Sequence, residues 1–241
     1  MSSHSAKPLN SLKELKAYIH RIERNGNDSG ASILPLGLQA VDGVLPEGGL
    51  PLGALHDVRG DAGPLMGFMA FLMGRVAAKG RPVLWLDPSD DLYLPGLQPY
   101  GLDTGNLVIP RAIAGDKALL WALNEAVATP ALGAVAAPLH KPDFTALRRL
   151  SLAAREQGVT VFLARQRGDI GASPALTRWH VAAAPGRRSG LPGMGDMAWS
   201  LTLEKCRNGP EGLSFTVVRS ESGWQAEPDR PVADAPAALT G

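Results

Sequence analysis

The sequence predicts an α/β fold: a mostly parallel sheet flanked by helices, with antiparallel strands at the C-terminal end. The first observation behind this prediction is that short, wholly apolar segments alternate with helical segments along the middle of the chain. Strands that are apolar on both sides need helices over both faces, which is typical of parallel α/β sheets. The second observation is a group of three later strand-like segments, which we assign to an antiparallel part.

The predicted elements follow one another in a regular order. Strands are predicted at 53–58, 82–86, 107–110, 132–137 and 159–164, and then at 179–184, 197–204 and 213–219. Helices are predicted at 65–79, 117–128 and 144–157. Ligands of such sheets bind beyond the carboxyl ends of the strands, so the turn 59–64 is the first place to look for a site.

Outside this core, the sequence predicts an N-terminal region at 1–32, a domain at 33–220 and a disordered tail at 221–241 that is rich in Pro and Ala. A helix is expected at 11–24, because apolar residues recur there at helical spacing and Ser11 with Glu14 forms a capping box. The helix either packs on its own domain or docks a partner. Its candidate partner contacts are Leu12, Leu15, Ile19 and Ile22.

Composition limits the class of protein. The 241 residues carry 24 Lys and Arg against 23 Asp and Glu, a formal charge of +1, which argues against coating nucleic acid by bulk charge alone. The single Cys206 excludes an intramolecular disulfide framework and a cysteine-rich zinc site. The polar start of the chain and the interrupted apolar stretch at 65–78 predict neither a signal peptide nor a membrane span. We therefore expect a cytoplasmic protein.

The turn at 59–64 has the position of a phosphate-binding loop without its chemistry. Such a loop needs glycines, a lysine that reaches the phosphate and a Ser or Thr that holds magnesium. Met66, Gly67 and Phe68 stand where the Gly-Lys-Ser/Thr should be, and Pro64 removes a backbone donor. We interpret the turn as structural and expect no catalytic residue and no cofactor. The residues of this degenerate loop are Gly60, Asp61, Gly63 and Gly67.

The other candidate ligand residues give little evidence for a metal site or a catalytic site. Asp87, Asp90 and Asp91 follow the second core strand. They would bind a metal or orient a water, or else cap a helix or lie in a solvated loop, and we favour the structural interpretation. No histidine lies at metal-ligand spacing from another or from Cys206, so no metal site is expected. His56 lies within an apolar strand and is interpreted as a hydrogen-bonded core histidine.

Basic residues cluster near the end of the predicted parallel sheet. The candidate DNA contacts are Arg148 and Arg149 on the helix 144–157, and Arg165 and Arg167 after the following strand. A solvated surface is the simpler interpretation, and an acidic partner or a nucleic-acid backbone is the functional one. Aromatic residues that would stack on bases do not interleave these arginines, which weakens the nucleic-acid interpretation.

The segment LPLGLQAVDGVLPEGGLPLGALHDVRG resembles the entry to a RecA-type ATPase core, and the resemblance continues collinearly to residue 218. Together with WALNEA, TRW and LTLEKCRNG, the degenerate core resembles the ImuA family. That resemblance implies a RecA-like fold and a non-catalytic accessory role in SOS-induced, error-prone translesion synthesis. The implied partners are an ImuB-type homologue of Y-family polymerases, an error-prone replicative-type DNA polymerase and RecA.

The sequence departs from recombinases in several places. Ser89 matches the position of their catalytic glutamate, and the segments that match their DNA-gripping loops, 137–143 and 165–175, are short. Lys205 and Arg207 match a basic pair at the recombinase subunit interface, so the resemblance implies partner binding there. A division inhibitor of the SulA type and a nucleotide-binding RecA-like ATPase remain as alternatives.

Overall fold

The computed structural model describes residues 8–9, 33–89, 92–111, 113, 115–140, 142–165, 171–186, 196–220 and 223–229. The helix expected at 11–24, with its four apolar partner candidates, lies outside these residues, as do Asp90, Asp91 and Arg167. Within the described residues, no helix is both long and apolar enough to cross a membrane.

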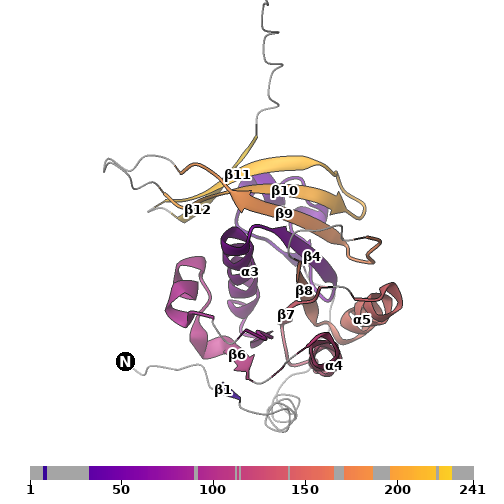
Figure 1. Ribbon diagram of the computed structural model, residues 1–241. Helices are drawn as coiled ribbons and strands as arrows, with labels where there is room; N and C mark the ends of the chain where they lie inside the picture. The colour runs from indigo at the N-terminus through magenta and orange to yellow at the C-terminus, as the bar shows by residue number, and fades with distance from the viewer. Residues whose placement is uncertain are drawn as a thin grey trace, which may run out of the picture.

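One large sheet organises the chain (Figure 1). Ten of the described strands form it in the order β1-β6-β5-β7-β8-β4-β9-β10-β11-β12. Pairing is parallel from β1 to β9 and antiparallel from β9 to β12. The parallel strands are β1 (Pro8–Leu9), β4 (Leu55–Gly60), β5 (Val83–Trp85), β6 (Leu107–Pro110), β7 (Ala134–Pro138), β8 (Thr160–Arg165) and β9 (Thr177–Ala183). The antiparallel strands that follow are β10 (Ala198–Cys206), β11 (Leu213–Ser220) and β12 (Gly223–Pro228).

Helices cover both faces of the parallel part. Helix α3 (Ala62–Ala77) packs on one face in a core that includes Phe68, Phe71 and Trp179. Helices α4 (Asp116–Val127) and α5 (Phe144–Gln157) cover the other face in a second core, and they lie together in Figure 1. The predicted fold class is therefore confirmed.

Short elements complete the domain. A two-stranded sheet, β2 (Ile33–Leu34) with β3 (Leu50–Pro51), precedes β4, and between its strands lie the short helix α2 (Gln39–Asp42) and a 3₁₀ turn, η1 (Pro46–Gly48). Two further 3₁₀ turns, η2 (Leu94–Tyr100) and η3 (Thr104–Asn106), lead from β5 to β6.

Several element boundaries differ from the sequence prediction, and two of them change the predicted turn at 59–64. Strand β4 runs two residues further than expected and α3 begins three residues earlier, so the predicted turn at 59–64 is almost entirely strand and helix. Pro64 falls within the first helical turn, where no backbone donor is required. The sheet also continues beyond residue 220, because β12 pairs with β11 and brings Trp224 onto the core.

Candidate functional site

The connection between β4 and α3 consists of one residue, Asp61. The Asp61 amide donates to the carbonyl of Val181 at 3.1 Å, and the Leu65 amide donates to the carbonyl of Asp61 at 2.8 Å. A phosphate-binding loop presents several free amides around an anion and adds a lysine. Here the connection is too short to present several free amides. The Asp61 amide already donates to Val181, and the one side chain of the connection is an acid.

The glycines of the predicted loop serve close packing. Gly60 pairs with Val181 of β9 and has a backbone φ of +149°. A Cβ at Gly60 would lie 1.8 Å from the Val181 carbonyl oxygen. Gly63 lies exposed in the first turn of α3 with open space around it. Gly67 is buried, and a Cβ there would lie 2.9 Å from ring atoms of both Trp199 and Tyr100. Gly60 and Gly67 therefore allow close packing, Gly60 against Val181 and Gly67 against the aromatic rings.

Aromatic side chains gather beside Gly67. Trp199 of β10 and Trp224 of β12 stack with ring centroids 4.4 Å apart. Tyr100 stacks on both of them at 5.7 and 5.8 Å, and Phe71 of α3 meets both edge-on. This aromatic cluster fixes α3 against the antiparallel strands.

Asp87 belongs to a loop turn. Its carboxylate accepts hydrogen bonds from the Ser89 amide and hydroxyl at 3.0 and 2.6 Å, and from the Leu92 amide at 3.2 Å. Asp87 therefore has a structural role in the loop after β5, but it is buried and caps loop amides, so it neither caps a helix nor lies in a solvated loop. Among the described residues, no group of three His, Cys, Asp or Glu side chains could hold a metal ion.

His56 is a hydrogen-bonded core histidine, as expected. Its Nε2 lies 2.9 Å from the Pro51 carbonyl, which only accepts, so Nε2 carries the proton. Nδ1 then accepts from the Thr177 hydroxyl at 2.7 Å, and that oxygen accepts from the indole N–H of Trp179 at 2.9 Å. Complete burial lowers the pKa of His56 from 6.5 to about 4, so the ring is neutral at pH 7.

A buried charge cluster lies at the sheet between β4, β8 and β9. The Asp57 side chain is fully buried, and its Oδ2 lies 3.8 Å from Nε of Arg178. Desolvation is the main cause that lowers the pKa of Arg165, and the negative charge of Asp57 opposes that decrease. Arg165 is 6% exposed and donates to the Leu139 carbonyl at 2.7 Å. The prediction of Arg165 as a DNA contact is therefore wrong, because the side chain is turned into the fold.

The other arginine candidates that the structure describes lie on the surface. Arg148 and Arg149 are both exposed on α5, on the opposite side of the sheet from α3.

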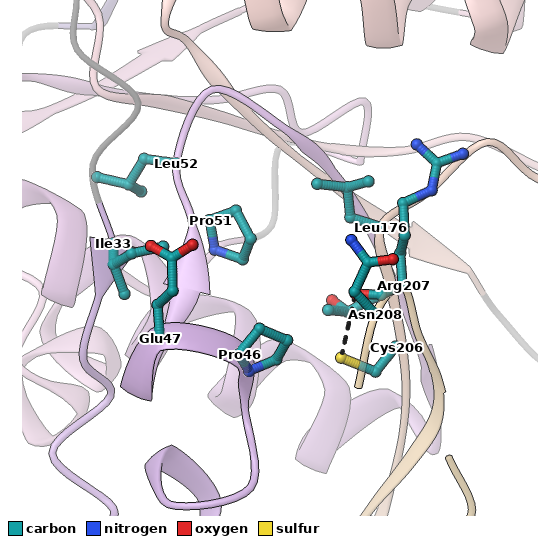
Figure 2. A pocket seen from close by; sticks show the side chains of 10 residues that line it. Ile33, Pro46, Glu47, Pro51, Leu52, Leu176, Cys206, Arg207 and Asn208 are labelled. Carbon is teal, nitrogen blue, oxygen red and sulfur yellow. Dashed lines mark hydrogen bonds between the residues drawn. The ribbon is translucent and has the colours of Figure 1, made fainter. Parts of the chain in front are cut away.

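The predicted interface pair lies at the end of β10, where the structure forms a pocket (Figure 2). Lys205 donates to the Ser173 carbonyl at 3.0 Å, whereas Arg207 is exposed on the pocket wall. The pocket has a volume of about 200 Å³. Its lining residues are Ile33, Pro46, Glu47, Pro51, Leu52, Leu176, Thr177, Cys206, Arg207 and Asn208.

Apolar side chains form most of the pocket lining, and Glu47 and Asn208 add polar groups. Glu47 and Asn208 lie on opposite sides of the view in Figure 2, and each has a left-handed backbone, with φ values of 58° and 64°. Burial, followed by the charge of Glu211, raises the pKa of the Cys206 thiol, so the thiol is protonated at pH 7. The pocket lies beside the starts of β4 and β9, at the opposite end of β4 from the connection at Asp61.

Sequence reasoning missed the aromatic cluster, the pocket and the buried acid. Asp57 could have been noticed, because it is a charged residue within the otherwise apolar strand GALHDV. The pocket had no local signal, since its walls come from four segments that are distant in sequence.

Comparisons with known proteins agree with this geometry. No family model matches the chain. Protein ImuA from two strains of Caulobacter vibrioides is 32% identical over 226 residues, covering 85% of this chain and 91% of the relative. The crystal structure of the RadB recombinase superposes with a TM-score of 0.59 at 16% identity, covering 80% of this chain and 99% of that one. The fold is thus RecA-like.

Proposed function

The chain belongs to the ImuA family, and from that premise we propose that it is a non-catalytic accessory protein of SOS-induced, error-prone translesion DNA synthesis. In this role it binds an ImuB-type homologue of Y-family polymerases and RecA, and works in the cytoplasm beside an error-prone replicative-type polymerase. It contributes binding surfaces and performs no nucleotide chemistry.

The connection at Asp61 is the observation that carries the non-catalytic part of this proposal. A RecA-like sheet of an ATPase needs room for a triphosphate between its first core strand and the following helix. Here Gly60 lies against Val181, and α3 begins at Ala62. Asp61 would also repel a triphosphate at this position. A one-residue connection without a lysine therefore supports the non-catalytic part of the proposal.

Partner binding then falls to surfaces away from this connection. Arg207 is exposed beside the pocket and is the better partner contact of the predicted pair. Lys205 acts within the fold, because its ammonium group is bonded to Ser173. The four apolar residues of the helix expected at 11–24 stay partner candidates on the sequence pattern alone.

A genetic experiment tests the biological role. A strain without this gene should show no rise in mutation frequency after DNA damage, and the wild-type gene should restore that rise. The purified protein should also retain the ImuB-type homologue from the same genome in a pulldown. An unchanged mutation frequency, combined with inhibited assembly of the tubulin-like division protein, would instead support a division inhibitor.

A nucleotide titration tests the non-catalytic claim separately. We expect no heat of binding when ATP and magnesium are added to the protein by calorimetry. A RecA protein with an intact phosphate loop serves as the positive control. Measurable hydrolysis by this chain would overturn the non-catalytic part of the proposal and leave the role in mutagenesis standing.

A further inference from the structure

The outer face of α5 combines positive charge with exposed apolar surface. Leu152 is 53% exposed, although its neighbours Leu147 and Leu150 are buried in the second core. Arg148 and Arg149 precede Leu152 by four and three residues, and Arg155 follows it by three. Side chains at these spacings are neighbours on a helix, and the exposed Glu156 follows Leu152 by four residues, so the exposed leucine lies among three guanidinium groups and one carboxylate.

A second apolar side chain extends this face. Phe144, 46% exposed, begins α5 and lies one turn before Arg148. From Phe144 to Leu152 the row spans about 12 Å at 1.5 Å per residue. We call the row of Phe144, Arg148, Arg149, Leu152 and Arg155 the α5 face.

The α5 face keeps a net positive charge within the part of the chain that the structure describes. All three arginines are exposed, and none forms a salt bridge with a described carboxylate. The helix itself carries a single acid, Glu156. Arg155 gains some stability from its place in the last turn, near the negative end of the helix dipole, but Arg148 and Arg149 have no such local role.

The apolar residues decide between two kinds of acidic partner. A nucleic-acid backbone would use the arginines, but an exposed leucine among them offers its phosphates nothing. No Tyr or Trp lies on α5 to stack bases, and Phe144 stands at the end of the row. A protein segment that carries acids beside apolar side chains would use every residue of the face, because its acids pair with arginines while its apolar groups cover Leu152 and Phe144.

We propose that the α5 face is the docking surface for an acidic segment of the polymerase-like partner, one that carries apolar side chains between its acids. This proposal rests on the proposed function, since that function supplies the partner. It places the partner on the opposite side of the sheet from α3.

Binding measurements with three variants test this surface. The probes are the purified ImuB-type protein from the same genome and a labelled single-stranded oligonucleotide, each titrated at low and high salt. The variants are Arg148→Glu with Arg149→Glu, Leu152→Ser, and a matched control, Lys117→Glu, which reverses an exposed charge on α4. Because all these side chains are exposed, every variant should unfold at the wild-type temperature.

We expect the double charge reversal and Leu152→Ser each to weaken partner binding about thirtyfold or more, the range of interface hot spots. The charge reversal should also remove most of the salt dependence, and Lys117→Glu should bind as wild type does. Leu152→Ser should leave oligonucleotide binding unchanged.

Two results would overturn the proposal. The first is that every variant binds the partner as tightly as the wild type does. The second is a charge reversal that abolishes oligonucleotide binding but spares the partner, which would make the face a nucleic-acid site. A wild-type protein that fails to bind the partner at all would refute the proposed interaction itself, before any variant is compared.

Discussion

A Cβ atom at position 67 would lie 2.9 Å from Cζ2 of Trp199, so the bare backbone of Gly67 is what lets the indole ring reach helix α3. The same glycine stands where a phosphate-binding loop would carry its lysine. Its side-chain hydrogen gives space to a tryptophan instead of giving an amide to a phosphate. Close packing in the aromatic cluster is thus a role for Gly67 that requires no nucleotide.

The same substitution should have opposite effects at two glycines of α3. Gly67→Ala should lower the free energy of unfolding by about 1–3 kcal/mol, because Trp199 and Tyr100 must move. Gly63→Ala should raise it by a few tenths to about 1 kcal/mol, since nothing lies within 4 Å and alanine favours the helix. Urea unfolding measures both, and equal effects would contradict the packing role.

Trp224 should stabilise the fold through its stack on Trp199. Trp224→Ala should reduce the free energy of unfolding by about 2–4 kcal/mol, at or below the usual cost for a core tryptophan because the ring is half-buried. Near-ultraviolet circular dichroism should lose intensity as the stacked pair is removed. Tyr93→Ala, at a side chain that is 72% exposed, is the control and should change stability by less than about 0.5 kcal/mol.

Asp57 should matter far more than a surface acid. Asp57→Asn leaves the guanidinium groups of Arg165 and Arg178 near the sheet without their counter-charge, and should cost about 3–5 kcal/mol. Glu204→Gln weakens the ion pair with Arg59, which is partly exposed, and should cost at most about 1 kcal/mol. Comparable losses in a denaturant titration would show that the Asp57 cluster is no more important than a surface pair.

The neutral His56 ring predicts a loss of stability in acid. Its pKa is about 4 when folded and 6.5 when unfolded, so the unfolded chain binds more protons between these values. The contribution of His56 to the free energy of unfolding should therefore be present in full above pH 6.5. It should be lost as the pH drops toward 4, by on the order of 3 kcal/mol.

The variant His56→Gln isolates this effect from that of other titrating groups. Its amide can donate to the Pro51 carbonyl but carries no proton that titrates in this range. The free energy of unfolding, measured across the interval, should depend less steeply on pH in the variant than in the wild type. Parallel curves would mean that His56 is not the group that titrates.

Much of the fold followed from local sequence. The apolar runs around Val83, Val135 and Val161 predicted buried parallel strands, and the helix predicted at 144–157 is α5 as the structure has it. Periodicity and full apolarity report burial directly, which is why these elements were predictable. The extra strand β12 was missed because Gly223–Pro228 is short, mixed in polarity and followed by a Pro- and Ala-rich tail.

The sequence by itself determined the order of the core strands and helices, the place of His56 in the core and the loss of the phosphate lysine, since each is written in residue type and spacing. Only the tertiary structure decided what the remaining residues do. It buried Arg165 beside Asp57, left Arg148 exposed, and brought Gly67 against Trp199. Those outcomes depend on strands that are distant in the chain and adjacent in the sheet, and burial and charge pairing are properties of that adjacency.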